Sequence, residues 1–384
     1  MVVREYGICY TEKVRCFSEH RPNQLIGWYG FLFVVVLGIV FTDEGMRISM
    51  KKRILLITTG GTIASSLRQE GQGLTPTVNG AGLEALLGPL TLEYQITVRD
   101  ILSLDSSNIQ PEEWRLIARN VAAAFAQKEY DGIVITHGTD TMAYTASILS
   151  FMLCHPPIPV VLTGSQLPII HPLTDAVENL RTALAMASSG TRGVFVAFNR
   201  RVILGTRAVK VRTTGFDAFE SVNAPYAAMV DGTGLRLNPA AIPPVTGDFF
   251  LEDRLCSNVF LLKLTPGLDP MVFEMLGKMQ YRGIVIEAFG LGGLHFIRRD
   301  LVAKLHAMAQ LGITVVVCSQ CLYERSDFSI YEAGVKALEQ GVLQGFDMTT
   351  EAAVTKLMWI LGQTNDPEQI RERFSQSIFG EIMV

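Results

Sequence analysis

Threonine hydroxyls lie beside glycines in two short loops, each of which directly follows a run of apolar residues. The loops are Thr58–Ile63 (TTGGTI) and Thr136–Thr141 (THGTDT). Adjacent glycines allow positive φ and close approach of the backbone, so the first loop can present the hydroxyl of Thr62 to a bound molecule. A threonine hydroxyl becomes nucleophilic only with a base beside it, and a carboxylate such as that of Asp140 can hold a substrate ammonium. Together the loops contain groups suited to nucleophilic attack on an amino compound.

Each loop also has an ordinary interpretation. The first could be a phosphate-cradling turn or a plain strand–loop transition, although neither G-x-G-x-x-G nor a P-loop lysine is present. In the second, Thr139 and Asp140 fall where a helix should begin, and Asp, Ser and Thr at a helix start accept hydrogen bonds from unpaired backbone N–H groups. Neither loop decides the function alone.

A third loop and one lysine could complete such a site. Residues 105–108 (DSSN) cluster a carboxylate with hydroxyls, and could either bind a zwitterionic amino acid or form an N-terminal capping turn. Lys210 lies among apolar and basic neighbours in GTRAVKVR, surroundings in which a lysine can serve as a base. The alternative for Lys210 is a solvated lysine on the surface.

Other catalytic and metal-binding patterns are missing from the sequence. There is no G-x-S-x-G and no H-E-x-x-H, and the six histidines (20, 137, 155, 171, 295 and 306) show no metal-ligand spacing. The pair Cys318 and Cys321 is interpreted as two small residues after a buried strand, because no second pair completes a zinc site. The glycines at 290–293 imitate the start of a dinucleotide fingerprint, but its final position, which needs a glycine, is His295. No metal site is expected.

The elements that must position the loops alternate between strands and helices. Expected strands are Arg53–Thr58, Tyr94–Leu102, Gly132–Thr136, Pro159–Thr163 and Gly193–Phe198, and expected helices are Gly80–Leu87, Pro111–Gln127, Thr141–Leu153 and Thr174–Ser188. Several strands are continuously apolar, as strands covered on both faces should be. Such alternation implies a parallel sheet with right-handed crossovers, and functional groups collect at the carboxyl ends of its strands.

A proline-rich stretch divides this region from a second one of similar kind. Residues 237–257 contain three prolines and little periodicity, and are interpreted as a linker. After it we expect strands at Asn258–Leu264, Gly283–Phe289 and Ile313–Cys318, and helices at Pro270–Lys278, Arg299–Gln310, Thr349–Gly362 and Asp366–Ser375. The sequence thus predicts a larger N-terminal α/β domain at 51–236 and a smaller α/β domain at 258–384.

Composition restricts the class of protein. The chain has 384 residues, of which 48% are hydrophobic and 18% charged, and its formal net charge is −4. High apolar content and low net charge argue against disorder, and the lack of a basic excess argues against nucleic-acid binding. Six cysteines in this length do not make a disulfide framework, so a cytoplasmic enzyme is expected.

The first fifty residues do not fit that picture. Leu25–Phe41 is a run of 17 uncharged residues, at the short limit for a membrane-spanning helix, and no small-residue cleavage pattern follows it. It could anchor the chain in a membrane, in which case the flanking charges would leave the downstream domain cytoplasmic. The preferred hypothesis is that residues 1–50 are an extension ahead of a true start at Met46 or Met50.

Taken together, the loops and the lysine resemble the L-asparaginase family, and most of all its cytosolic, type I bacterial branch. The matching segments are Thr58–Ser65, Leu104–Trp114, Gly132–Ala146, Leu162–Pro168, Gly205–Asn223, Lys263–Gly267 and Lys356–Gln363. The resemblance runs from about Lys51 to the C terminus and leaves residues 1–50 unmatched. It implies a two-domain asparaginase-like α/β fold, with the larger, mostly parallel sheet in the N-terminal domain.

The resemblance also implies an L-asparagine amidohydrolase that releases L-aspartate and ammonia. Thr62 would attack the side-chain amide and form an acyl-enzyme, while Lys210 takes a proton through Thr139 and Asp140 grips the α-ammonium. The residues implied at the α-carboxylate end are Asp105, Ser106 and Ser107, and Gly61 is assigned to the substrate-binding set. Backbone N–H groups can stabilise the oxyanion, so no cofactor is expected. A homodimer or homotetramer would close the site.

Two departures from the family pattern keep other functions open. Many members carry a tyrosine on the flap after TGGTI, where this chain has Leu74, and the turn at 289–293 offers no polar side chain to a neighbouring subunit. The missing tyrosine motivates a non-catalytic asparagine sensor as an alternative. A second alternative is the amidase component of a tRNA-dependent amidotransferase, although residues 1–50 are too short for the N-terminal domain of such components.

Overall fold

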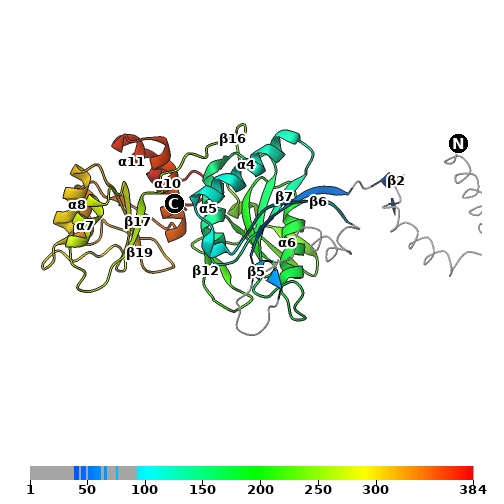
Figure 1. Ribbon diagram of the computed structural model, residues 1–384, viewed down its shortest axis with the longest axis horizontal. Helices are drawn as coiled ribbons and strands as arrows, with labels where there is room; N and C mark the ends of the chain where they lie inside the picture. Colours follow the sequence, from blue (N-terminus) through cyan, green and yellow to red (C-terminus); the bar gives the residue numbers. More distant parts are fainter. Residues whose placement is uncertain are drawn as a thin grey trace, which may run out of the picture. The chain divides into compact units, whose positions relative to one another are not determined.

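The computed structural model describes residues 51–61 and 93–383 in full, and the backbone of four short strands between residues 39 and 76 (Figure 1). Those strands are β1 (Ile39–Thr42) with β2 (Gly45–Ile48), and β4 (Ser65–Ser66) with β5 (Thr75–Pro76). Thr62, Leu74 and the expected helix Gly80–Leu87 lie outside the described residues, as does nearly all of the run Leu25–Phe41. Among the helices that are described, none is long and apolar enough to cross a membrane.

The chain divides into two compact units, and the elements that matter for the site belong to one of them. Met1–Lys52 with Gly88–Gln95 form the first unit, and Arg53–Leu87 with Ile96–Val384 form the second. The second unit contains an eight-stranded sheet and a four-stranded sheet.

The eight-stranded sheet has a parallel centre and an antiparallel edge. In spatial order its strands are β15 (Gly234–Leu237), β14 (Ala228–Asp231), β11 (Arg201–Leu204), β10 (Gly193–Phe198), β9 (Pro159–Thr163), β7 (Gly132–Thr136), β3 (Lys52–Gly60) and β6 (Tyr94–Leu104). β3, β7, β9 and β10 run parallel, and β11, β14 and β15 pair antiparallel. The register aligns Thr58 with Thr136 and Thr136 with Thr163, so β7 and β9 end level with each other and β3 ends two residues later.

Helices bury alternate residues of the central strands on opposite faces. Leu55 and Ile57 join a core cluster with α4 (Pro111–Gln127) and α5 (Met142–Met152). The intervening Leu56 is equally buried but is not part of that cluster, and α6 (Ala176–Ala187) packs on β9 and β10. Alternation along a strand sends successive side chains to opposite faces, so both faces of the sheet are covered, which explains its continuously apolar strands.

The smaller sheet is entirely parallel. Its strands, in order, are β17 (Val259–Lys263), β18 (Gly283–Ala288), β19 (Thr314–Ser319) and β20 (Leu343–Gln344). Its helices are α7 (Met271–Lys278), α8 (Leu301–Gln310), α9 (Glu332–Glu339), α10 (Thr350–Gln363) and α11 (Pro367–Ser375). The two-domain α/β architecture expected from the sequence is confirmed.

Expected and observed elements agree closely along the parallel sheets and differ elsewhere. β7, β9, β10 and α4 have the expected bounds, and the other expected elements that are described shift by one or two residues at their ends. The antiparallel strands β11 to β15, α9 and β20 were not expected. Residues 237–257 contain a 3-10 turn at Pro239–Ala241 and the strand β16 (Phe250–Leu251), which pairs with β8 (Leu153–Cys154). The boundaries 51–236, 237–257 and 258–384 remain our proposal.

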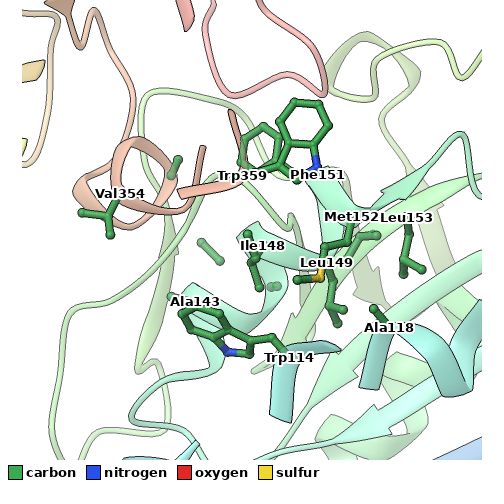
Figure 2. Packing of buried hydrophobic residues seen from close by; sticks show 14 of the residues in the cluster. Trp114, Ala118, Ala143, Ile148, Leu149, Phe151, Met152, Leu153, Val354 and Trp359 are labelled. Carbon is green, nitrogen blue, oxygen red and sulfur yellow. The ribbon is translucent and has the colours of Figure 1, made fainter. Parts of the chain in front are cut away.

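Helix α10 connects the two sheets. It packs against α5, and the indole of Trp359 stacks on the ring of Phe151 with centroids 5.8 Å apart (Figure 2). The hydroxyls of Ser147 and Thr355 are hydrogen-bonded at 2.7 Å in the same interface. Because Phe151 and Trp359 belong to one continuous core cluster, the elements of the N-terminal region and α10 are buried together.

A buried ion pair fixes the end of the chain to α10. Lys356 Nζ lies 2.6 Å from Glu381 Oε1, and both side chains are fully buried. The ammonium also donates to the carbonyls of Phe374 and Gln376, while the carboxylate accepts from the backbone of Ile378. Burial lowers the pKa of Lys356, against the opposing effect of Glu381. Each charge is thus compensated by several partners.

Removing one charge should leave the other buried and uncompensated. We expect Lys356→Met to lower the free energy of unfolding by about 3–5 kcal/mol, the usual cost of breaking a buried pair. The control is Lys304→Met, which removes an exposed partner of Glu274 and should change stability by less than about 1 kcal/mol. Urea unfolding of both variants measures the difference, and equal losses would contradict this account.

Candidate active site

Two loops meet backbone to backbone at the carboxyl ends of β3 and β7. Gly61 has φ +81°, and a Cβ built on it would lie 2.4 Å from the backbone nitrogen of Gly138. A Cβ on Gly138 would in turn lie 2.5 Å from the Oγ of Ser106, and one on Gly164 would lie 2.3 Å from the carbonyl oxygen of His137. Side chains at these positions would force the loops apart, so the glycines permit three loops to share one small region.

A lysine, a threonine and an aspartate form a hydrogen-bonded cluster beside that contact. Lys210 ends β12 (Ala208–Lys210), which pairs with β13 (Phe219–Ser221). Its Nζ lies 2.8 Å from Thr139 Oγ1 and 2.6 Å from Asp140 Oδ1. The side chain of Lys210 is 17% exposed and that of Asp140 is 63% exposed, so the cluster is reachable from solvent through Asp140. Lys210 is therefore not a free surface lysine.

The capping interpretation of the second loop does not describe what these side chains do. Thr141 is the N-cap residue of α5, and no side-chain hydrogen bond caps that helix. Thr139 and Asp140 bind Lys210 instead, and the hydroxyl of Thr141 donates to the carbonyl of Ser106 at 2.7 Å. The hydroxyls and carboxylate of this loop therefore tie separate segments together.

Gln166, which the sequence reasoning did not single out, contacts the same hydroxyl. Its Nε2 donates to the carbonyls of Thr213 and Gly215, each at 3.1 Å. Those bonds turn Oε1 toward Thr139, whose Oγ1 donates to it at 3.3 Å. Thr139 thus accepts from the lysine while donating to the glutamine. Gln166 lies after β9, and its position following a buried strand is the sequence signal that could have found it.

The third loop forms the capping turn that was one of its two interpretations, and its binding of an amino acid stays a prediction. Asp105 caps the 3-10 helix Ser106–Asn108, with Oδ1 accepting from the backbone and the hydroxyl of Ser107. These hydrogen bonds hold the pKa of Asp105 below its usual value, so the carboxyl stays ionised. Ser106 is buried, and its Oγ accepts from the backbone N–H of Asp140 at 3.3 Å. The loop is thereby fastened to the cluster that contains Lys210.

The structure brings most of the predicted residues together. Thr139, Asp140 and Lys210 are in direct contact, and Ser106 and Gly61 touch the same loop. Thr62 directly follows Gly61 and lies outside the described residues. No group of histidine, cysteine and acidic side chains able to hold a metal occurs in the described part of the chain. Cys318 is buried in β19, where desolvation raises its pKa to about 12, and Cys321 is exposed.

His137 occupies the buried centre beneath the second loop. Its Nδ1 lies 2.7 Å from the carbonyl oxygen of Gly138, and its Nε2 lies 3.0 Å from Thr145 Oγ1. The indole N–H of Trp114, on α4, donates to the same Thr145 hydroxyl at 3.0 Å. Burial lowers the pKa of His137 from 6.5 to about 4, which keeps the ring neutral at physiological pH. The sequence reasoning assigned none of these three residues a role.

The contact between Gly61 and Gly138 should tolerate no side chain. We expect Gly61→Ala to destabilise the fold by about 3 kcal/mol, from left-handed strain together with overpacking against backbone that cannot yield. Gly190→Ala is the matched control, since Gly190 has φ +76° and nothing within 4 Å of a built Cβ. It should cost only about 1 kcal/mol. Thermal unfolding measures the stability lost in each variant. Equal losses would contradict the close approach of Gly61 to the Gly138 backbone.

The buried imidazole should make stability depend on pH. His137 has a folded-state pKa near 4 against 6.5 when unfolded, so its contribution is fully present above pH 6.5 and is lost as pH falls toward 4. Between pH 7 and pH 5 we expect this residue to cost about 2 kcal/mol of unfolding free energy. His137→Asn removes the titrating group and should lose less stability over that range. Urea denaturation at both pH values measures the difference, and parallel losses would contradict it.

Comparisons with known proteins identify the family of the chain. Residues 53–243 match the family described as Asparaginase, N-terminal, and residues 258–374 match the Glutaminase/Asparaginase C-terminal domain. The chain is 45% identical to the L-asparaginase of Thermococcus kodakarensis over 86% of its own length and 99% of that protein. It is 34% identical to a component of the glutamyl-tRNA(Gln) amidotransferase of Pyrococcus furiosus, covering 86% of this chain and 76% of that one.

Solved structures give the same assignment. The thermostable L-asparaginase from Thermococcus kodakarensis superposes with a TM-score of 0.81, covering 86% of this chain and 99% of that one. L-asparaginase I from Vibrio cholerae, at 30% identity, superposes with a TM-score of 0.77 over 87% of this chain and all of that one. Family matches over both domains, high identity and a shared fold point the same way: the chain is a hydrolase that belongs to the asparaginase family.

Proposed function

We propose that the chain hydrolyses the side-chain amide of L-asparagine and releases L-aspartate and ammonia. The observation that carries the proposal is the cluster in which Lys210 Nζ lies within hydrogen-bond distance of both Thr139 Oγ1 and Asp140 Oδ1. An amine that is hydrogen-bonded to a hydroxyl can act as a base: the nucleophile gives its proton to the hydroxyl, and the hydroxyl passes its own proton to the amine. The 45% identity to an L-asparaginase over nearly its whole length supports the choice of substrate.

The proposed reaction begins with Thr62, which follows Gly61 in the chain. As its Oγ attacks the amide carbon, its proton passes to Thr139 while Thr139 gives its own proton to a neutral Lys210. Collapse of the tetrahedral intermediate returns a proton to the departing nitrogen, breaks the C–N bond and leaves an acyl-enzyme ester. Water then adds to the ester by the same route and releases aspartate. For this transfer the Thr139 hydroxyl must turn from Gln166 toward Lys210, a rotation about one bond.

Charge suggests how the amino-acid end would be held. Asp140 presents an exposed carboxylate to solvent, and Asp105 is held in its ionised form, so both attract the α-ammonium. The hydroxyl of Ser106 is a neutral donor suited to the α-carboxylate, whereas the hydroxyl of Ser107 donates to Asp105. Ser106 accepts from the Asp140 backbone, which leaves its own hydrogen available to a ligand. Selection of asparagine over glutamine would then depend on the distance between this end and Thr62.

Two other functions are alternatives to asparagine hydrolysis. The match to a component of a glutamyl-tRNA(Gln) amidotransferase favours an amidase that serves a tRNA-bound substrate. The chain covers 76% of that component but 99% of the Thermococcus L-asparaginase, which favours the free amino acid. A non-catalytic sensor would bind asparagine without turnover, and the lysine–threonine contact argues for chemistry instead. We also propose that the enzyme is a homodimer or homotetramer in the cytoplasm.

Ammonia release from purified protein tests the proposal. With L-asparagine we expect turnover that falls at least about 1,000-fold in both Thr62→Ala and Lys210→Met, because each removes one member of a cooperating set. Lys278→Met, which changes an exposed lysine of α7, should keep wild-type activity. Asparagine binding without ammonia release by the wild type would favour the sensor. Activity that appears only with charged tRNA and a partner protein would favour the amidotransferase.

A further inference from the structure

Three buried side chains form a chain of hydrogen bonds that ends on one peptide group of the proposed active site. Trp114 on α4, Thr145 on α5 and His137 after β7 are 7%, 0% and 0% exposed. The bonds run from the indole of Trp114 to Thr145 Oγ1, from Thr145 Oγ1 to His137 Nε2, and from His137 Nδ1 to the Gly138 carbonyl. The polar atoms of these side chains are thus bonded to one another and to the Gly138 peptide, while the lysine cluster lies beside them.

The direction of each bond follows from what the groups can donate. An indole N–H only donates, so Thr145 Oγ1 accepts from Trp114 and has its own hydrogen left for His137 Nε2. A carbonyl oxygen only accepts, so Nδ1 must carry the hydrogen that it shares with Gly138. Both ends therefore demand the same tautomer of a neutral ring, with hydrogen on Nδ1 and a lone pair on Nε2. The low pKa of His137, near 4, keeps the ring in that neutral form.

Fixing the Gly138 carbonyl also fixes the N–H of Thr139. The described residues contain no cis peptide bond, and a trans peptide directs its N–H opposite to its C=O. The Thr139 N–H accordingly points away from the His137 ring. Among the described residues, none accepts a hydrogen bond from it, although the hydroxyl of the same residue is bound by Lys210 and Gln166. A preorganised backbone donor beside the proton-transfer group is suited to stabilise a developing oxyanion.

We propose that His137 is a positioning residue for amide hydrolysis, because it holds the Gly138–Thr139 peptide so that the Thr139 N–H faces the oxyanion of the tetrahedral intermediate. This inference rests on the proposed function. In this proposal Trp114 and Thr145 act together, because their hydrogen bonds select the tautomer of His137 that can donate to the Gly138 carbonyl. The close packing of Gly61, Gly138 and Gly164 around this peptide prevents it from rotating in another way.

Two amide substitutions at His137 distinguish a positioning role in catalysis from a role in core packing alone. The amide nitrogen of asparagine branches from Cγ, as Nδ1 does, so His137→Asn can still donate to the Gly138 carbonyl. Glutamine places its amide one bond further out, near the position of Nε2, so His137→Gln loses that donor while remaining able to contact Thr145. Asparagine and glutamine are both neutral, polar and smaller than histidine, so we expect the two substitutions to destabilise the fold by similar amounts.

The measurement is kcat and KM for L-asparagine in wild type and both variants, at a temperature well below their unfolding midpoints. We expect kcat of His137→Gln to fall about 10- to 100-fold with KM nearly unchanged, and kcat of His137→Asn to stay within about 5-fold of wild type. Thr145→Val, which removes the donor to Nε2, should also lower kcat more than it changes KM. Equal kcat in the two amide variants, or a loss confined to KM, would overturn the inference.

A second readout does not depend on turnover. Nitrogen-15 NMR of protein labelled at histidine should show, at pH 7, a neutral ring with hydrogen on Nδ1 whose signal is lost in both His137 variants. Hydrogen on Nε2 would overturn the assignment whatever the kinetics. If wild-type protein releases no ammonia from asparagine, the proposed function and the oxyanion role both fall. If the wild type is active while both amide variants keep its kcat, only the inference about His137 fails.

Discussion

The structure of the site depends on how closely two loops of backbone can approach one another. Thr58, Thr136 and Thr163 lie side by side in register near the carboxyl ends of three parallel strands, so the loops that follow leave the sheet at one edge. They would collide if the residues in contact had side chains, because a Cβ on Gly61 would lie within 2.4 Å of the Gly138 nitrogen. Glycine removes that obstacle, and the hydroxyls and carboxylate carried by neighbouring residues then meet within hydrogen-bond distance.

Buried charge holds the surrounding elements in place. Arg207, three residues before Lys210, has a fully buried side chain that lies 3.1 Å from Asp347 Oδ2 and donates to the Gly380 carbonyl. Lys356 and Glu381 form a second pair in the last part of the chain. Such pairs add little net stability over apolar replacements, but breaking one leaves an uncompensated charge. The first pair therefore ties the segment just before the strand that carries Lys210 to Asp347, which follows the C-terminal sheet.

The sequence pattern predicted some parts of the fold far better than others. β7, β9 and β10 were predicted correctly because both of their faces are buried, which makes each a continuous apolar run bounded by turns. The edge strands β14 and β15 are only four residues long, and β13, in a separate two-stranded sheet, has three; their partly exposed side chains give weak alternation. Helix α9 has only eight residues, little more than two turns, so its pattern covers too short a stretch to be recognised from the sequence.

The sequence by itself determined which residue types stand at the strand ends, and hence the family and the candidates Thr139, Asp140 and Lys210. Local order fixes these features, since each loop follows its own strand within a few residues. Only the tertiary structure decided which groups share a hydrogen bond. Gln166 reaches Thr139 across 27 positions, Lys210 across 71, and the tautomer of His137 follows from an indole on another helix. Such pairings depend on packing between elements distant in the chain, and no local pattern encodes them.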